Sequence, residues 1–224
     1  MPRTASEEDS VKELIRKLCE LKKSHIADLV DKRLSEFKAM RERGSHEWFS
    51  ELCFCILTAN YTAEGGMRMQ VELGYDGFAK LSKMKLAERL RKLGHRFPNS
   101  RASYIVEARK YACGLKETLL KIGEEYEMRE WLVRNVRGIG YKEASHFLRN
   151  VGFENLAILD RHIIKVMRKY GLARGIVPPE GGSLSRKRYL LLERKLADVA
   201  KRARMSLGEL DLYLWHIETG KILK

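Results

Sequence analysis

A lysine follows a glycine-rich turn in the segment "VRGIGYKEASHFLRN", which runs from Val136 to Asn150. Gly138 and Gly140 can take backbone angles that are closed to other residues, so the chain can turn sharply there and come close to a ligand. A turn that leads into a helix leaves backbone N–H groups pointing outward, and these groups bind anions such as a phosphate. Lys142 therefore stands beside a predicted phosphate site.

The residues after this turn have the spacing of an amphipathic helix. Its predicted buried face consists of Ala144, Phe147, Leu148 and Val151. At about 100° per residue, Lys142 falls nearly opposite this face, beside His146 and Arg149. We therefore predict that Lys142, His146 and Arg149 lie on the exposed side of the helix, where they can contact an anionic ligand.

An aspartate follows a short apolar run in the segment "NLAILDRHIIKVMRKYG". Asp160 is placed to be the N-cap of a helix that Gly171 closes. Most aspartates in such a position do nothing else. The pattern by itself therefore predicts a cap and leaves a chemical role open.

Apolar residues recur at helical spacing along almost the whole chain, and no useful window alternates with period two. The sequence therefore predicts an all-α protein. "SHEWFSELCFCILTAN" predicts a central buried helix with Ser45 as its N-cap, and Asn99 or Ser100 is placed to cap the helix after Pro98. Near the end of the chain, "SLGE" predicts a capping box at Ser206.

The composition of three further segments predicts a loop, a basic helix and a pair of buried thiols. "VPPEGGS", residues 177–183, predicts a loop, and Gly220 is placed to end the last helix. The segment Arg186–Arg204 predicts a strongly basic helix, whose charged face lies either in solvent or beside a phosphate backbone. Cys53 and Cys55 lie in an apolar run and predict buried free thiols, and the four cysteines form no metal-binding pattern.

The chain of 224 residues has 44 Lys and Arg against 30 Asp and Glu, which leaves a net charge of +14. Such an excess favours a polyanionic partner, because each neutralised phosphate releases condensed counterions. A Lys- and Glu-rich surface of the thermophilic kind explains the charge content but not its sign. No apolar run approaches membrane-spanning length. We expect a soluble cytoplasmic protein that associates with the nucleoid and contacts no membrane.

The hairpin and the aspartate segment together resemble the helix-hairpin-helix DNA glycosylase superfamily. "NVRGIGYKEAS" matches the hairpin, with Arg137 where many members have proline, and "LDRHI" matches the aspartate segment. The resemblance implies two helical subdomains, with the helix-hairpin-helix motif in one of them and an active-site cleft between them. We predict one subdomain from residues 1–56 and 156–224, and a second from residues 57–155.

The resemblance also implies site residues. Lys142 is the implied nucleophile, which must be neutral when it attacks, and Asp160 is the assisting carboxylate. Because members that only release the base lack this lysine, a bifunctional enzyme is implied, which nicks the strand by β-elimination. The implied DNA contacts are Gly138, Gly140, Arg137, His146 and Arg149, and Asn60 is the candidate wedge that fills the gap left by a flipped base.

Within the superfamily, the length of the chain and its last residues, "LDLYLWHIETGKILK", resemble the small archaeal-type 8-oxoguanine glycosylases. The implied function is excision of 8-oxoguanine from double-stranded DNA and cleavage at abasic sites, by a monomer. By this resemblance Phe97 and Trp215 stack on the extruded base, and the terminal carboxylate of Lys224 accepts the N7 proton of 8-oxoguanine. The alternatives are a core position for Trp215 and a frayed chain end at Lys224.

Two other functions explain part of the pattern. A non-catalytic helix-hairpin-helix module for DNA binding explains the charge and the glycines but gives Asp160, Phe97 and Trp215 no joint role. A glycosylase for oxidised pyrimidines, of the endonuclease III kind, carries four C-terminal cysteines that bind an iron–sulfur cluster. Because no cysteine follows Cys113, we expect no such cluster, no other cofactor and no metal.

Overall fold

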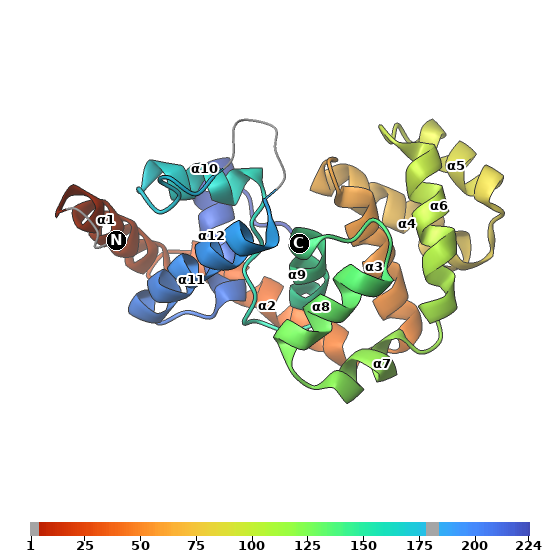
Figure 1. The fold of residues 1–224 in the computed structure, drawn as a ribbon, viewed down its shortest axis with the longest axis horizontal. Coiled ribbons are helices and arrows are strands. Elements are labelled where there is room, and N and C mark those ends of the chain that lie inside the picture. The colour runs from red at the N-terminus through yellow and green to blue at the C-terminus, as the bar shows by residue number, and fades with distance from the viewer. Residues whose placement is uncertain (1–4, 178–183) are drawn as a thin grey trace. The chain divides into compact units, whose positions relative to one another are not determined.

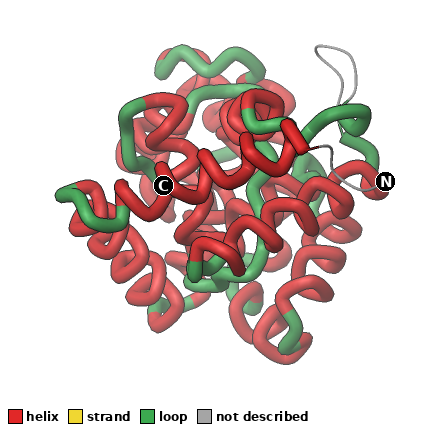
Figure 2. The backbone as a smooth tube through the Cα atoms, turned by 90° about the vertical axis from the view of Figure 1, so that its left-hand side faces the viewer, coloured by secondary structure: helices red, strands yellow, loops and turns green. Residues whose placement is uncertain are grey.

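The computed structural model describes residues 5–177 and 184–224, so all of the predicted loop except Val177 lies outside the described residues. The described residues contain helices and no strand (Figures 1 and 2), which confirms the prediction of an all-α protein. The helices of the first half are α1 (Ala5–Leu21), α2 (Ile26–Glu42), α3 (Ser45–Thr58), α4 (Ala63–Lys80), α5 (Lys83–Lys92) and α6 (Pro98–Ala108). After the short 3-10 helix η1 (Arg109–Tyr111) follow α7 (Leu115–Ile122), α8 (Glu125–Asn135), α9 (Tyr141–Asn150), α10 (Arg161–Lys169), α11 (Arg186–Ala203) and α12 (Leu207–Thr219).

The chain divides into two compact units. The first unit takes the described residues up to Glu36 and from Glu154 onward, and the second is Phe37–Phe153. The predicted boundary between residues 155 and 156 lies close to the observed one. The predicted boundary between residues 56 and 57 differs because it falls inside α3, which packs within the second unit against α4, α6, α7 and α9.

The core of the second unit is built around α3, as its apolar sequence predicts. Every residue of α3 from Leu52 to Thr58 is buried. The predicted cap of this helix is wrong, because Gly44 takes the N-cap position. The Ser45 hydroxyl instead serves α7: it accepts a hydrogen bond from Lys116 N at 3.3 Å and donates one to Glu117 Oε2 at 2.8 Å.

The start of α6 also differs from the prediction. Phe97 takes the N-cap position without a side-chain cap, and Pro98 is the first residue of the helix. Proline suits this position because its φ is already helical and its missing N–H would have no helical partner. Asn99 and Ser100 therefore lie inside the first turn and cap nothing.

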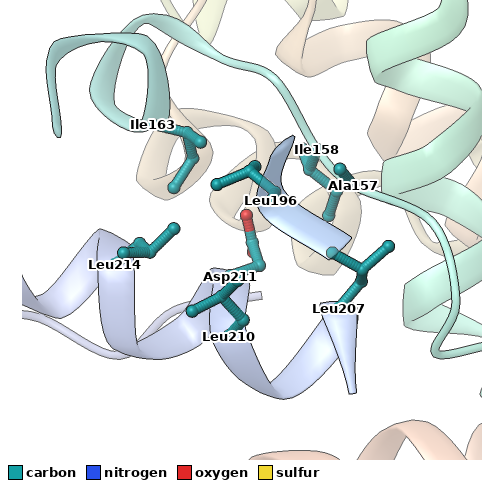
Figure 3. A pocket seen from close by; sticks show the side chains of 8 residues that line it. All are labelled: Ala157, Ile158, Ile163, Leu196, Leu207, Leu210, Asp211 and Leu214. Carbon is teal, nitrogen blue, oxygen red and sulfur yellow. The ribbon is translucent and has the colours of Figure 1, made fainter. Parts of the chain in front are cut away.

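In the first unit, α12 packs against α10 and α11 across an apolar seam, and α1 packs against α11. The seam is lined by Ala157, Ile158, Ile163, Leu196, Leu207, Leu210, Asp211 and Leu214 (Figure 3). Both predicted ends of α12 are confirmed. Ser206 Oγ accepts a hydrogen bond from Glu209 N at 3.0 Å, and Gly220 ends the helix with a φ of 73°. The apolar side chains of the seam hold α12 against the segment that leads into α10.

Cys53 and Cys55 are buried, as predicted, and burial raises the pKa of the Cys53 thiol. Cys19 and Cys113 are exposed and free.

Within residues 5–177 and 184–224, no helix has both the length and the apolar character needed to cross a bilayer.

Candidate active site

The hairpin requires glycine at Gly138. Its φ is +86°, and an added Cβ would lie 2.3 Å from Cδ2 of Tyr104, which belongs to α6. Gly140 differs from the prediction, because its φ of −100° and ψ of −172° describe an extended conformation that any residue adopts. Close packing on Tyr104 therefore sets the shape of the turn. Of the two glycines, only Gly138 has a backbone conformation that requires glycine.

Arg137 fixes the hairpin to the same helix. Its Nη1 atom lies 3.1 Å from Oε1 of Glu107, and its guanidinium carbon lies 5.2 Å from the centre of the Tyr104 ring. The Arg137 side chain is nevertheless 65% exposed, so its charge remains available to a ligand at the hairpin.

Lys142 lies in the first turn of α9, directly after the hairpin, with 24% of its side chain exposed. Its Nζ atom is 3.2 Å from Oε1 of Glu143, whose other oxygen accepts a hydrogen bond from Gly140 N at 3.3 Å. One carboxylate thus binds both the hairpin backbone and the lysine amine. Sequence reasoning missed Glu143, although a glutamate three residues after an N-cap is typical of a capping interaction.

The prediction that His146 and Arg149 share an exposed face with Lys142 is wrong. Both are buried: His146 packs edge-on against Phe54 with ring centres 5.6 Å apart, and the Arg149 guanidinium lies 4.7 Å from the Phe37 ring. The reason is that α9 packs against both α3 and α8, so its residues from Ala144 to Asn150 are all buried. Only the first turn of α9 is accessible, and neither side chain is a candidate phosphate contact.

Phe97 and Asn60 are exposed in the second unit. Phe97 is 37% exposed, its backbone N–H donates to His95 Nδ1 at 2.9 Å, and the Arg96 guanidinium lies 5.0 Å from its ring. Asn60 follows α3 with a φ of +55°, in a left-handed conformation that asparagine tolerates better than most residues. Ala59 takes the C-cap position of α3, so Asn60 lies just beyond the end of the helix.

In the first unit, Asp160 is the N-cap of α10, as predicted. Its Oδ1 atom accepts hydrogen bonds from His162 N and Ile163 N, both at 2.8 Å. Its Oδ2 atom accepts one from Nε1 of Trp215 in α12, at 3.3 Å. The structure therefore brings together two of the predicted site residues that are 55 positions apart.

Trp215 is partly buried and its ring meets His162 edge-on, with ring centres 5.4 Å apart. The alternative of a core position is not supported, because other residues of α12 fill the core and leave part of Trp215 accessible. Lys224, the last residue, is partly buried rather than fully exposed.

The sequence profile of a family described as 8-oxoguanine DNA glycosylase matches residues 30–205 of this chain. The chain belongs to this family. The matched range contains the hairpin and the aspartate segment, and the match confirms the resemblance that they indicated.

Relatives of known structure cover nearly the whole chain. A protein of Methanocaldococcus jannaschii named 8-oxoguanine DNA glycosylase/AP lyase is 51% identical over 211 residues, which span 94% of this chain and 99% of that protein. The crystal structure of the M. jannaschii glycosylase/lyase with a 15mer DNA containing 8-oxoguanine matches with a TM-score of 0.89 and 50% identity, over 95% of this chain and 100% of that one. The 8-oxoguanine DNA glycosylase of Thermotoga maritima matches with a TM-score of 0.87 and 47% identity, over 96% and 100%.

Proposed function

We propose that this chain excises 8-oxoguanine from double-stranded DNA and then cleaves the strand through a Schiff base on Lys142. As a member of the family, it is an enzyme of base-excision repair, a DNA N-glycosylase with AP lyase activity. The observation that carries the role of Lys142 is its position: a partly exposed amine in the first turn of α9, directly after the hairpin held by Gly138.

The reaction begins with a neutral Lys142 amine. Its Nζ attacks C1′ of the damaged nucleotide, and the bond between C1′ and the base breaks with its electron pair leaving on the base, which takes up a proton. The resulting amine adduct opens to a Schiff base. Loss of a proton from C2′ then expels the 3′ phosphate by β-elimination. Glu143, whose carboxylate lies 3.2 Å from Nζ, is positioned to receive the proton that Lys142 gives up.

Asp160 supplies negative charge as the sugar becomes positive in the transition state. Its two oxygens have separate roles. Oδ1 is held by the first N–H groups of α10, while Oδ2 faces the Trp215 indole. A carboxylate fixed in this way needs little reorganisation during the reaction, which is the condition for strong electrostatic stabilisation.

Recognition of the lesion requires that the base leave the helix. We propose that Phe97 and Trp215 each offer an aromatic face to the extruded base and that Asn60 fills the gap left behind. The terminal carboxylate of Lys224 accepts the N7 proton that distinguishes 8-oxoguanine from guanine. Gly138, Gly140 and Arg137 contact phosphates, through backbone N–H groups and a side-chain charge.

The proposed partner is DNA that contains 8-oxoguanine or an abasic site, bound by a monomer on the nucleoid in the cytoplasm. The net charge of +14 supports a polyanionic partner. If about six phosphates are contacted, log K should fall with log salt at a slope near −5, from ~0.9 per phosphate. A slope near zero would contradict this mode of binding, and light scattering of the free protein tests the monomer.

One experiment separates the proposal from its alternatives. The protein is incubated with duplexes that carry 8-oxoguanine or thymine glycol, with borohydride present to reduce any Schiff base. The proposed enzyme forms a covalent complex with the 8-oxoguanine duplex. A non-catalytic DNA-binding module traps neither duplex, and a pyrimidine glycosylase traps the thymine glycol duplex in preference.

A further inference from the structure

His95 is a buried histidine between α5 and α6 that makes two hydrogen bonds to backbone groups. Its Nε2 atom lies 2.9 Å from the carbonyl oxygen of Leu57, and its Nδ1 atom lies 2.9 Å from Phe97 N. A carbonyl can only accept and an N–H can only donate, so Nε2 carries the proton and Nδ1 accepts. The ring is therefore neutral, with one tautomer fixed by its two partners.

The surroundings of the ring favour the same state. His95 is 4% exposed, and burial lowers its pKa. The ring stacks on Tyr61 with ring centres 4.4 Å apart and planes inclined by 24°, and the Tyr61 hydroxyl donates to the Gly94 carbonyl at 3.0 Å. His95 is thus held on its edges by hydrogen bonds and on one face by an aromatic ring.

One hydrogen-bond partner of His95 is a candidate lesion contact, and the other lies close in sequence to a second candidate. Phe97 is the exposed aromatic residue itself, and Leu57 lies near the end of α3, three residues before the exposed Asn60. Arg101 of α6 extends the connection, because its guanidinium donates to the carbonyl of Ala59 and lies 5.8 Å from the Phe97 ring. Backbone carbonyls at the end of α3 are therefore bound by the segment that carries Phe97.

We propose that His95 is a positioning residue for lesion recognition, which holds Phe97 in its stacking position and ties it to the end of α3 that carries Asn60. This inference rests on the proposed role of Phe97 in stacking on the extruded base. An exposed aromatic side chain at the start of a helix has considerable freedom unless its backbone is fixed. The bond from Phe97 N to His95 supplies that restraint before DNA arrives.

Two substitutions of His95 each keep one of its two hydrogen bonds and remove the other. In His95→Asn the side-chain oxygen lies near the position of Nδ1 and can still accept from Phe97 N, but the bond to Leu57 is lost. In His95→Gln the amide reaches the position of Nε2 and can still donate to Leu57, but Phe97 loses its acceptor. Both variants lose the ring that stacks on Tyr61, and each keeps one of the two hydrogen bonds, so they form a matched pair.

The readouts are single-turnover excision of 8-oxoguanine and cleavage of a ready-made abasic site, measured below the melting temperatures of both variants. We expect His95→Gln to lose excision by roughly tenfold or more, because it weakens a stacking contact, while abasic-site cleavage changes much less. His95→Asn should retain more excision than His95→Gln. Combining His95→Gln with Phe97→Leu should add little to the loss from Phe97→Leu alone, because both changes affect one contact.

The outcomes separate this inference from the proposed function. If Phe97→Leu lowers excision but His95→Gln does not, the positioning role is wrong and the role of Phe97 stands. If Phe97→Leu leaves excision unchanged, both are wrong. Equal losses of the two activities in both histidine variants, in proportion to lost thermal stability, would show that His95 is only a structural residue. These three results all overturn the inference.

Discussion

Trp215 Nε1 donates a hydrogen bond to Asp160 Oδ2 over 3.3 Å, and this bond joins α12 to the N-terminus of α10. The tryptophan proposed to stack on the base and the aspartate proposed to stabilise the sugar are therefore held in one arrangement before DNA binds. The helix cap on Oδ1 holds the same carboxylate from the other side. Recognition and charge stabilisation thus depend on a single small group of bonds.

Asp160→Asn keeps an oxygen for the helix cap and removes the charge, and it also replaces the acceptor of Trp215 Nε1 with an NH2 donor. Asparagine caps a helix about as well as aspartate, so we expect the melting temperature to change little. The excision rate should fall by roughly a hundredfold or more, because the stabilising charge is lost. Thermal unfolding and single-turnover excision measure the two effects. A variant that is fully active but melts at a lower temperature would mean that Asp160 is only a cap.

Lys142→Gln removes the amine but keeps a polar side chain in the first turn of α9. We expect it to abolish base release and borohydride trapping while DNA affinity stays nearly unchanged, since one of several phosphate contacts is affected at most. Lys83→Gln, at an exposed lysine of α5, is the matched control and should trap normally. Trapping that survives in Lys142→Gln would assign the nucleophile to another residue.

Gly138→Ala and Gly140→Ala form a matched pair in the hairpin. At Gly138 the φ of +86° and a Cβ contact of 2.3 Å with Tyr104 predict a loss of about 1–3 kcal/mol of stability from backbone strain, with further loss from the clash. At Gly140 the backbone is extended and the nearest atom is Glu143 Oε2 at 3.2 Å, so the loss should be smaller. Chemical denaturation measures both, and equal losses would contradict the difference in conformation.

Deleting Lys224 tests whether the terminal carboxylate recognises the base. The truncated chain carries its terminal carboxylate on Leu223, one residue short. If the carboxylate of Lys224 accepts the N7 proton of 8-oxoguanine, this displacement leaves a buried donor unpaired, and excision should slow roughly 5- to 150-fold at ~1.4 kcal/mol per decade. Cleavage of a ready-made abasic site needs no base recognition and should change much less. Both activities are measured on the same truncated protein, and equal losses or no loss would leave Lys224 without a recognition role.

Local rules predicted the parts of the fold that local contacts decide. The cap at Asp160, the cap at Ser206 and the end of α12 at Gly220 all follow from interactions within a few residues. The prediction that Ser45 caps α3 failed, because its hydroxyl binds partners that lie 71 and 72 positions away in α7. No pattern within the α3 sequence reveals such a partner.

The same limit explains what sequence reasoning missed in the site. A helical wheel for α9 assumes that one side faces solvent, whereas α3 and α8 both cover this helix and bury His146 and Arg149. The bond between His95 and Leu57 spans 38 positions, and the bond between Trp215 and Asp160 spans 55. Spacing identified several of these residues as candidates, but only the packed chain shows which of them touch.

The burial of α9 limits which substitutions in this helix can change the reactivity of Lys142, the proposed nucleophile. From Ala144 to Asn150 every side chain is enclosed, so a substitution there disturbs the core before it alters the chemistry. Tyr141, Lys142 and Glu143 are the partly accessible positions of the helix. Laboratory selection for altered rate or lesion preference should therefore accumulate changes at Tyr141 and Glu143 and leave the rest of α9 unchanged.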